Sequence, residues 1–408
     1  MKQIRVNIKI FVLILSICVF SCQNQTSQAQ SKTSNGEAET AITVGAARTD
    51  AYLPLLRGKS IGMVVNQTST IGNTHLVDSL LASGIKIIKI FAPEHGFRGQ
   101  ADAGEKVSDG KDNQTGLPIA SLYGAKRKPA PTDLAGIDLM VFDIQDVGAR
   151  FYTYISTMHY IMEACAENDI PMLVLDRPNP NGHYVDGPVL DTSRYRSFVG
   201  MHPIPTVHGM TIGEYAQMVN GERWLVGGLQ CDLTVIPCEN YSHDRPYILP
   251  IKPSPNLPNN RAIYLYPSIC LFEGTVFSLG RGTSKQFQVI GAPDYPQTAF
   301  SFTPVSRPGA TYPKHEDKTC YGLDLTQLLP EQIFAERQLN LSYLLDIYQT
   351  YPHKDKFFLE SNFFEKLSGN DELKAQLIAG KSEAEIRASW EPELGQFKES
   401  RKKYLLYD

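Results

Sequence analysis

Polar and charged side chains gather at the ends of four apolar segments in the first half of the chain. They are Asn66 after residues 61–65, Glu94 and His95 after 85–91, residues 143–150 at the end of 139–144, and residues 176–182 after 171–175. If these segments are parallel strands, their carboxyl ends meet in one ligand crevice. Amides, carboxylates and arginines with interleaved aromatic residues suit the hydroxyl groups and ring faces of a sugar.

Carboxylates are the residues in this set that could do chemistry. Cleavage of a glycosidic bond requires a proton donor for the leaving oxygen and a carboxylate on the other face of the ring. Glu94, Asp143, Asp146 and Asp176 lie in the expected crevice, and Glu273 follows an apolar run in the second half of the chain. Each alone could be a helix cap or a surface carboxylate, but their grouping at strand ends favours a functional site.

The elements that would position these residues alternate between apolar strands and helices. Strands are expected at 61–65, 85–91, 139–144 and 171–175, and helices at 75–83, 153–167 and 211–220. Mostly apolar strands separated by helices indicate a parallel sheet that is covered on both faces. The sequence therefore predicts a Rossmann-like α/β domain over residues 44–239. Neither GxGxxG nor GxxxxGK[ST] occurs in it, so no nicotinamide or nucleoside triphosphate cofactor is expected.

The second half, residues 240–408, differs in composition and is predicted to form a smaller α+β domain. It is rich in Pro, Asn and Tyr, with short strand-like pieces at 268–279 and 287–290. Residues 339–406 are expected to be mostly helical, and Ser382 followed by Glu385 predicts a capping box at the start of the last helix.

The N-terminus predicts export. Cationic residues within the first nine positions precede an apolar run at 10–20, which is shorter than the ~20 residues that cross a bilayer. The run ends in Val-Phe-Ser-Cys22, which resembles the lipobox of bacterial lipoproteins. We therefore expect a signal peptide at 1–22 with lipidated Cys22 and a flexible tether at 23–43. The protein would then be a periplasmic or outer-membrane lipoprotein of the cell envelope; an ordinary cleaved signal with an incidental cysteine is the alternative.

Charge and cysteine content disfavour several other classes. The net charge is −4 and no block of Lys and Arg occurs, so nucleic acid is not an expected partner. The five cysteines beyond Cys22 form no CxxC pair, which disfavours a zinc site or a disulfide scaffold. Cys231 and Cys238 could pair, but buried free thiols are expected. HxxxH, HExxH and GxSxG spacings are also missing, so neither a metal-dependent hydrolase nor a serine esterase is predicted.

Five longer motifs follow one another along the chain. They are FAPEHGFRG (91–99), DIQDVGARFYTY (143–154), LDRPNPNG (175–182), VHGMTIGEYA (207–216) and FEGTVFSLGRGT (272–283). Together they resemble the bacterial exo-β-N-acetylmuramidases of the NamZ type, over residues 44–408. The resemblance implies an active site in the cleft between the two domains. It also implies release of N-acetylmuramic acid from the non-reducing ends of peptidoglycan fragments, without metal or organic cofactor, in cell-wall recycling or salvage.

The resemblance and the residue types together suggest catalytic roles. Glu94 is expected to be the general acid, because it follows Pro93 at a strand end and has aromatic neighbours that could raise its pKa. Asp143, Asp146 and Glu273 compete for the role of second carboxylate. Glu273 would come from the other domain, so that closing the cleft would complete the site.

Substrate-binding roles are predicted for a wider set of residues. Arg150, Arg177 and Arg281 are candidates for the lactyl carboxylate of muramic acid, because a guanidinium can bind a carboxylate bidentately. A structural salt bridge is the alternative for each arginine. The other predicted binding residues are Asn66, His95, Gln145, Tyr154, Asp176, Asn179 and His208. Turn formation or a place in the core would explain several of these equally well.

A second class of function also fits the sequence. A lipid-anchored muropeptide- or sugar-binding protein would share the cleft, the aromatic residues and the arginines but would need no proton donor. Release of product from a glycoside separates an enzyme from such a binder.

Overall fold

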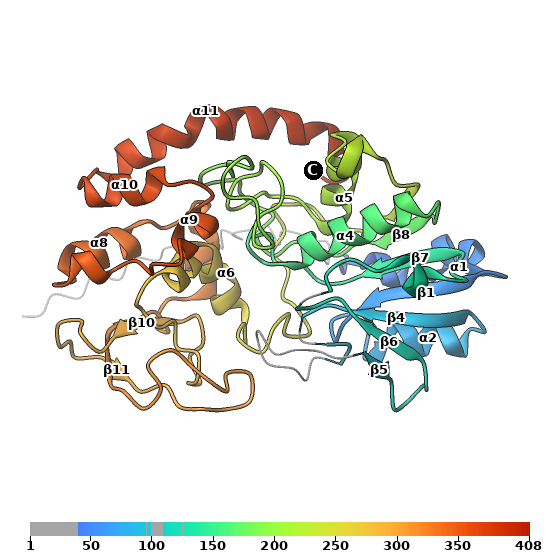
Figure 1. Ribbon diagram of the computed structural model, residues 1–408, viewed down its shortest axis with the longest axis horizontal. Helices are drawn as coiled ribbons and strands as arrows, with labels where there is room; N and C mark the ends of the chain where they lie inside the picture. The colour runs from blue at the N-terminus through green and yellow to red at the C-terminus, as the bar shows by residue number, and fades with distance from the viewer. Residues whose placement is uncertain (1–39, 95, 99–108, 125) are drawn as a thin grey trace, which may run out of the picture. The chain divides into compact units, whose positions relative to one another are not determined.

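A mostly parallel sheet frames the first half of the chain (Figure 1). The computed structural model describes residues 40–94, 96–98, 109–124 and 126–408. Within these residues seven strands pair in the order β5-β6-β4-β1-β7-β8-β9. Their bounds are β1 Ser60–Val65, β4 Lys86–Ala92, β5 Gly110–Lys111, β6 Pro118–Ser121, β7 Leu139–Asp143, β8 Met172–Leu175 and β9 Leu233–Ile236. Only β5 pairs antiparallel, at one edge. The predicted α/β sheet is confirmed.

Helices cover both faces of this sheet because successive side chains of each strand point to opposite faces. Val64 of β1 and Phe142 of β7 belong to one hydrophobic cluster, with helices α4 (Tyr154–Glu167) and α5 (Ile212–Gly221). Met63 of β1 belongs to the cluster on the other face, with helices α1 (Thr49–Leu56) and α2 (Leu76–Ala82). The central strands are therefore apolar on both faces, as the sequence predicted.

The second half of the chain has a sheet of its own. In residues 240–408, all of them described, three strands pair antiparallel in the order β10-β12-β11. They are β10 Val289–Ala292, β11 Ser301–Phe302 and β12 Cys320–Asp324. The helices are α6 Asn260–Ile269, α7 Pro330–Glu336, α8 Ser342–Thr350, α9 Phe363–Ser368, α10 Glu372–Ile378 and α11 Glu383–Arg401. Ser382 and Glu385 form the predicted capping box of α11. The smaller α+β fold is thus confirmed.

One prediction for the second half was wrong in part. Residues 268–279 were expected to be strand-like, but α6 runs to Ile269 and the 3₁₀ helix η3 (Cys270–Gly274) follows. Only the end of the segment is extended, where Thr275 and Ser278 form isolated antiparallel bridges with Phe358 and Gly291. The Oδ1 atom of Asn259 accepts a hydrogen bond from the Ala262 amide at 3.0 Å and so caps α6 at its start. The aromatic and β-branched residues of α6 are buried, and this packing outweighs their preference for strands.

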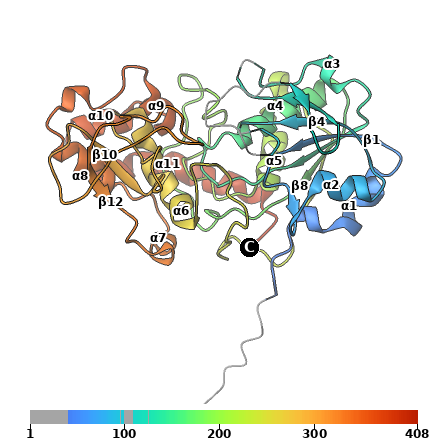
Figure 2. The same cartoon turned by 90° about the horizontal axis from the view of Figure 1, so that it is seen from below.

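The two halves share one hydrophobic core. A single cluster of buried residues includes Val64 and Phe142 of the large sheet, Ile290 of the small sheet and Trp390 of α11. Helix α11 runs from the helices of the second half to α5 of the first half (Figure 1), and Figure 2 shows it crossing between them. Arg401 at its end donates to the Gly209 carbonyl at 2.7 Å. The core is therefore continuous between the halves.

Two sequence predictions concern cysteines and the N-terminus. Cys231 and Cys238 are buried free thiols, as are the other cysteines in the described residues. The predicted signal peptide, Cys22, most of the tether and His95 lie outside the described residues. Among the residues that are described, no helix is long and apolar enough to cross a membrane.

Candidate active site

A cavity lies where the end of β4 meets segments from the second half of the chain. Its lining residues are Glu94, Phe151, Tyr152, Thr153, Tyr154, Ser254, Asn256, Leu257, Tyr266, Arg281 and Phe287. Three predicted site residues, Glu94, Tyr154 and Arg281, come together here from three different motifs. The cavity thus combines a carboxylate, an aromatic wall and a guanidinium.

Glu94 reaches the cavity from the loop that follows β4, and its side chain is half-buried. The Thr153 hydroxyl donates a hydrogen bond to Oε2 of Glu94 at 3.3 Å. Burial raises the pKa of the Tyr123 phenol, and the charge of Glu94 and a hydrogen bond to its carboxylate raise it further. Burial and then the Glu94 charge likewise raise the pKa of Tyr154. The hydroxyls of Thr153 and Tyr123 therefore bond to the carboxylate and orient it.

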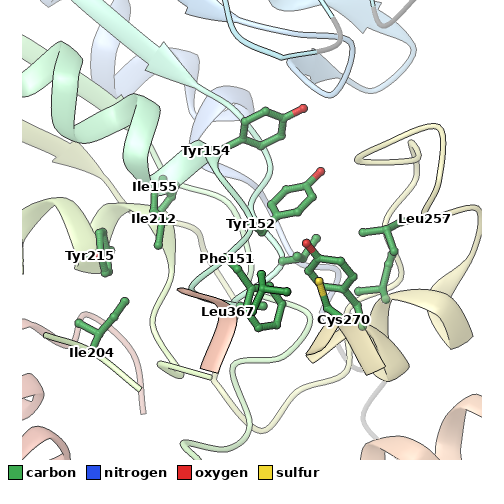
Figure 3. Close-up of a cluster of buried hydrophobic side chains, with 14 of the residues drawn as sticks. Phe151, Tyr152, Tyr154, Ile155, Ile204, Ile212, Tyr215, Leu257, Cys270 and Leu367 are labelled. Atoms are coloured by element: carbon green, nitrogen blue, oxygen red, sulfur yellow. The ribbon is translucent and has the colours of Figure 1, made fainter. Parts of the chain in front are cut away.

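The aromatic wall joins the two halves of the chain. The phenols of Tyr152 and Tyr154 donate to the same acceptor, the Pro253 carbonyl, at 2.7 and 3.4 Å. Their rings meet edge to face at 4.9 Å, and the ring of Tyr152 meets Tyr266 of α6 at 5.9 Å. Figure 3 shows the hydroxyls of Tyr152 and Tyr154 pointing to the same side, away from Tyr215. Such a wall offers a firm apolar surface to a sugar ring.

A tight backbone turn holds Arg281 in the wall of the cavity. Gly280 and Gly282 have φ values of 75° and 81°, which favour glycine. The Nε atom of Arg281 donates to Oε1 of Glu273 at 3.0 Å, and the guanidinium lies 4.9 Å from the centre of the Phe287 ring. None of the described residues accepts a hydrogen bond from its two terminal nitrogens. The terminal part of the guanidinium can therefore bind a ligand anion.

Glu273 remains ionised beside the cavity. Burial alone would raise the pKa of Glu273, but the charges of Arg281 and Lys314 outweigh it and lower that pKa. The Lys314 ammonium is fixed by the Thr275 and Phe277 carbonyls at 2.7 and 3.0 Å. Glu273 is therefore an anion in a local group of two cations.

Side chains of the protein itself fill the crevice between β1 and β7. The strand order reverses there, and open α/β sheets commonly bind their ligands at such a point. In this chain Arg177 forms a bidentate pair with Asp143, with nitrogen–oxygen distances of 2.5 and 2.9 Å. Arg177 also donates to the Thr70 carbonyl at 3.1 Å. Both charged groups are fully buried and satisfy each other, and neither lines the cavity.

Asp176 caps a helix. Its Oδ1 atom accepts from the Gly213 amide at 2.7 Å, and its Oδ2 atom accepts from the hydroxyls of Thr211 and Tyr407 at 2.7 and 2.5 Å. Burial raises the pKa of Asp176 to about 6. These bonds join the end of β8 to the start of α5, and they leave Asp176 away from the cavity.

Asp146 and His208 form a second buried pair behind the cavity. Oδ2 of Asp146 accepts from the Gly148 amide at 2.7 Å and lies 3.8 Å from Nε2 of His208. Burial raises the pKa of Asp146 to about 7 and lowers the pKa of His208 to about 3. At neutral pH the histidine is therefore uncharged, and neither residue lines the cavity.

The Arg150 guanidinium is enclosed by backbone carbonyls. Nη1 donates to Pro188 and Ile204, each at 2.8 Å, and Nη2 donates to Leu367 at 2.9 Å. The Leu367 carbonyl lies in the last turn of α9, where the helix dipole favours a cation. Arg150 therefore joins loops of the first half to a helix of the second half.

The structure thus divides the predicted site residues into separate groups. Glu94, Tyr154 and Arg281 line the cavity, Glu273 is paired with Arg281, and Asn66 contacts Tyr154. The side chains that lie in the buried network of strand-end loops are Asp146, Gln145, Arg150, Asp176, Arg177, Asn179 and His208. For example, the amide of Gln145 donates to the Asp146 and Pro178 carbonyls, both at 2.7 Å, and that of Asn179 donates to Met210 at 2.8 Å.

Several residues in the cavity wall or in contact with Glu94 were not predicted. Tyr123 and Thr153 contact Glu94, and Asn256 and Tyr266 line the wall. Thr153 lies inside the motif 143–154, next to the predicted residue Tyr154, so its position was a usable signal. Asn256 lies in a proline-rich stretch that resembles a simple connection.

A larger groove lies elsewhere in the described residues. Its volume is about 820 Å³, and both tryptophans of the chain, Trp224 and Trp390, line it. None of the predicted site residues lies in its wall, so the cavity at Glu94 is the better candidate for the active site. Among the described residues, no three His, Cys, Asp or Glu side chains are placed to hold a metal ion together.

Comparisons with known proteins cover nearly all of the described chain. Family models described as exo-beta-N-acetylmuramidase NamZ, N-terminal and C-terminal, match residues 61–261 and 264–407. The peptidoglycan beta-N-acetylmuramidase NamZ of Bacillus subtilis is 41% identical over 385 residues, which cover 87% of this chain and 89% of that protein.

Solved structures show the same fold. A DUF1343 family protein from Bacteroides fragilis is 50% identical, with a TM-score of 0.84, and a second one from the same organism is 28% identical, with a TM-score of 0.74. Each match covers 90% of this chain and 99% of the other chain.

Proposed function

Because the chain belongs to the NamZ family of exo-β-N-acetylmuramidases, we propose that it is a glycoside hydrolase that releases N-acetylmuramic acid from the non-reducing ends of peptidoglycan fragments. One observation supports this cavity as the active site: Glu94 and Arg281 both line it. The reaction requires a proton donor, and its substrate carries a carboxylate. The cavity has a residue suited to each.

Glu94 is the proton donor of the proposed reaction. It is a half-buried carboxyl group that lines the cavity, with the hydroxyls of Thr153 and Tyr123 to fix its direction. When protonated, Glu94 would give its proton to the glycosidic oxygen as the bond to the anomeric carbon breaks.

Glu273 is the second carboxylate that the geometry favours. Asp143 and Asp146 are enclosed, with 0% and 4% of their side chains exposed, whereas 24% of the Glu273 side chain is exposed. Glu273 is held ionised by Arg281, which does line the cavity. An ionised carboxylate near the ring stabilises the positive charge that develops at the anomeric carbon.

Arg281 is the arginine that we assign to the lactyl carboxylate. Arg150 donates to three backbone carbonyls, and Arg177 is paired with Asp143. Of these three candidates, Arg281 is the one that lines the cavity and whose terminal nitrogens bond to none of the described residues. Recognition of this carboxylate would separate muramic acid from glucosamine.

Export and lipid anchoring are a further part of the proposal, supported by the sequence of residues 1–22. An anchored enzyme would meet wall fragments in the cell envelope, where recycling or salvage begins. Metabolic labelling with a fatty-acid analogue tests this point: the wild-type chain should be labelled and Cys22→Ala should not. Equal labelling of both would contradict a lipid on Cys22.

The catalytic proposal is tested with Glu94→Gln and two substrates. One is the disaccharide with N-acetylmuramic acid at its non-reducing end, and the other is an aryl glycoside whose phenolate leaves without a proton. Loss of a general acid should slow disaccharide cleavage by about 10²–10⁴-fold and slow aryl glycoside cleavage much less. Glu372→Gln, an exposed carboxylate of α10, is the matched control.

Two results would contradict the proposal. Near-normal cleavage of the disaccharide by Glu94→Gln would remove Glu94 from the reaction. Tight binding of the disaccharide by the wild-type protein without any product would favour a sugar-binding protein instead.

A further inference from the structure

Asn256 is one of the residues that line the cavity at Glu94, and its side chain has an unused hydrogen-bond acceptor. Only 2% of the residue is exposed to solvent. The Oδ1 atom is buried and has no hydrogen-bond partner among the residues that the structure describes. An unpaired buried carbonyl oxygen costs roughly 1–3 kcal/mol, so it calls for an explanation.

The direction of this amide is fixed by its other end. The Nδ2 atom donates to the Gly309 carbonyl at 2.9 Å. A carbonyl can only accept, so the NH₂ group must face Gly309 and Oδ1 must be the unpaired atom. The backbone amide of Asn256 is also fixed, because it donates to the Ser254 hydroxyl at 3.3 Å. The acceptor is therefore set in place before any ligand binds.

We propose that Oδ1 of Asn256 accepts a hydrogen bond from the acetamido N–H of N-acetylmuramic acid and thereby selects substrates with an N-acylated amino group at C2. This inference rests on the proposed function of the cavity. Glu94 must reach the oxygen on C1, and C2 is the adjoining ring carbon. The substituent on C2 therefore lies within the same small part of the cavity as Glu94.

The surroundings of Asn256 fit an acetamido group better than a hydroxyl. Leu257, Tyr266 and Phe287 line the cavity with it and would give the acetyl methyl apolar contacts. A hydroxyl both donates and accepts, and it can turn toward other partners. An amide N–H only donates, in the plane of its group, and so matches a fixed acceptor.

The assignments also follow the order of the substituents round the sugar. Glu94 would act at C1, Asn256 would bind the nitrogen on C2, and Arg281 would bind the lactyl group on the oxygen of C3. All three residues line one cavity. Binding of one ring thus accounts for a carboxylate, an amide acceptor and a guanidinium together.

The test compares two aryl glycosides in the wild-type protein and in Asn256→Ala. One is the β-glycoside of N-acetylmuramic acid, and the other carries an acetate ester at C2 in place of the acetamide and so lacks the N–H. The wild type should prefer the amide in kcat/KM by about 10–100-fold, since the ester leaves Oδ1 unpaired. Asn256→Ala should reduce this preference to about threefold or less.

A merely structural role would give a different result. If Asn256 only holds the loop at Gly309, both substrates should slow equally and the preference should stay unchanged, which would overturn the inference. Should Asn256→Ala fail to fold, Asn256→Gln keeps the amide but displaces its oxygen by one methylene. It should then reduce the amide preference, and an unchanged preference would also overturn the inference.

Failure of the inference can be told apart from failure of the proposed function. If Glu94→Gln abolishes disaccharide cleavage but Asn256→Ala has the same amide preference as the wild type, the inference alone fails. If the wild type cleaves neither glycoside, the proposed function fails. Calorimetric binding of N-acetylmuramic acid and of its 2-O-acetyl analogue then tests Asn256 without catalysis, with the same expected loss of preference in Asn256→Ala.

Discussion

Exchange of Arg281 for lysine is the sharpest test of how the cavity recognises muramic acid. Lysine keeps a positive charge beside Glu273, so the carboxylate that Arg281 holds ionised keeps a cation near it. What Arg281→Lys removes is the planar pair of terminal nitrogens, which none of the described residues bonds. Those nitrogens are free to grip a carboxylate bidentately, and an ammonium cannot do so.

The size of the effect follows from the kind of bond that is lost. A hydrogen bond to a charged group contributes about 1.5–3 kcal/mol, and each 1.4 kcal/mol is about tenfold in an equilibrium or rate ratio. The kcat/KM of Arg281→Lys on an aryl N-acetylmuramide should therefore fall by roughly 10- to 150-fold. On the matching N-acetylglucosaminide, which has no lactyl group, it should change by less than about threefold.

The assay is release of the aryl group from both glycosides by the wild type and Arg281→Lys. Arg194→Lys is the matched control, because Arg194 forms an exposed bidentate pair with Asp371 away from the cavity. An equal loss of kcat/KM on both glycosides would show that Arg281 supports the reaction without binding the lactyl group. Unchanged rates on both would refute the assignment altogether.

Two further predictions concern buried charges. Arg150→Met leaves the carbonyls of Pro188, Ile204 and Leu367 without their donor, so the free energy of unfolding in urea titrations should fall by ~3–5 kcal/mol. Burial raises the pKa of Asp146 from 3.8 to about 7, which favours the protonated acid in the folded protein. Its contribution to stability is thus present below about pH 4 and is lost as the pH rises to 7. Asp146→Asn should therefore gain stability relative to the wild type by ~2–3 kcal/mol between pH 5 and pH 8.

Each of these has a clear opposing result. A stable Arg150→Met protein with a raised KM would contradict this role and would indicate that Arg150 binds the substrate, as the sequence first suggested. A constant stability difference between Asp146→Asn and the wild type at pH 5, 6.5 and 8 would show that Asp146 titrates as it does in the unfolded chain.

The large sheet was predictable because its strands are apolar on both faces. The continuous apolar runs at residues 61–65 and 139–144 predict buried strands between helices, and the structure has β1 and β7 there. The segment 268–279 was not predictable in the same way. Its aromatic and β-branched residues favour a strand, but the cap by Asn259 and burial against the rest of the core make it helical as far as Gly274.

The sequence predicted where the site would lie better than it predicted which side chains would line it. The sequence shows that polar residues follow the strands, but it does not show which of them satisfy one another. Arg177 and Asp143 are 34 positions apart and neutralise each other, and this decides that neither reaches the cavity. Arg281 is chemically the same residue as Arg177, and only its partners in space differ. Asn256 carried no sequence signal, because its role depends on an acceptor left without a donor.

The continuous core has a consequence for how such a chain can be altered. Since one cluster of buried residues includes both sheets and α11, cutting the chain near residue 262 would expose apolar surface on both fragments. The two matched regions, 61–261 and 264–407, are then sequence segments that cannot be exchanged as modules. A hybrid with halves from two relatives would need both sides of the shared packing to change together.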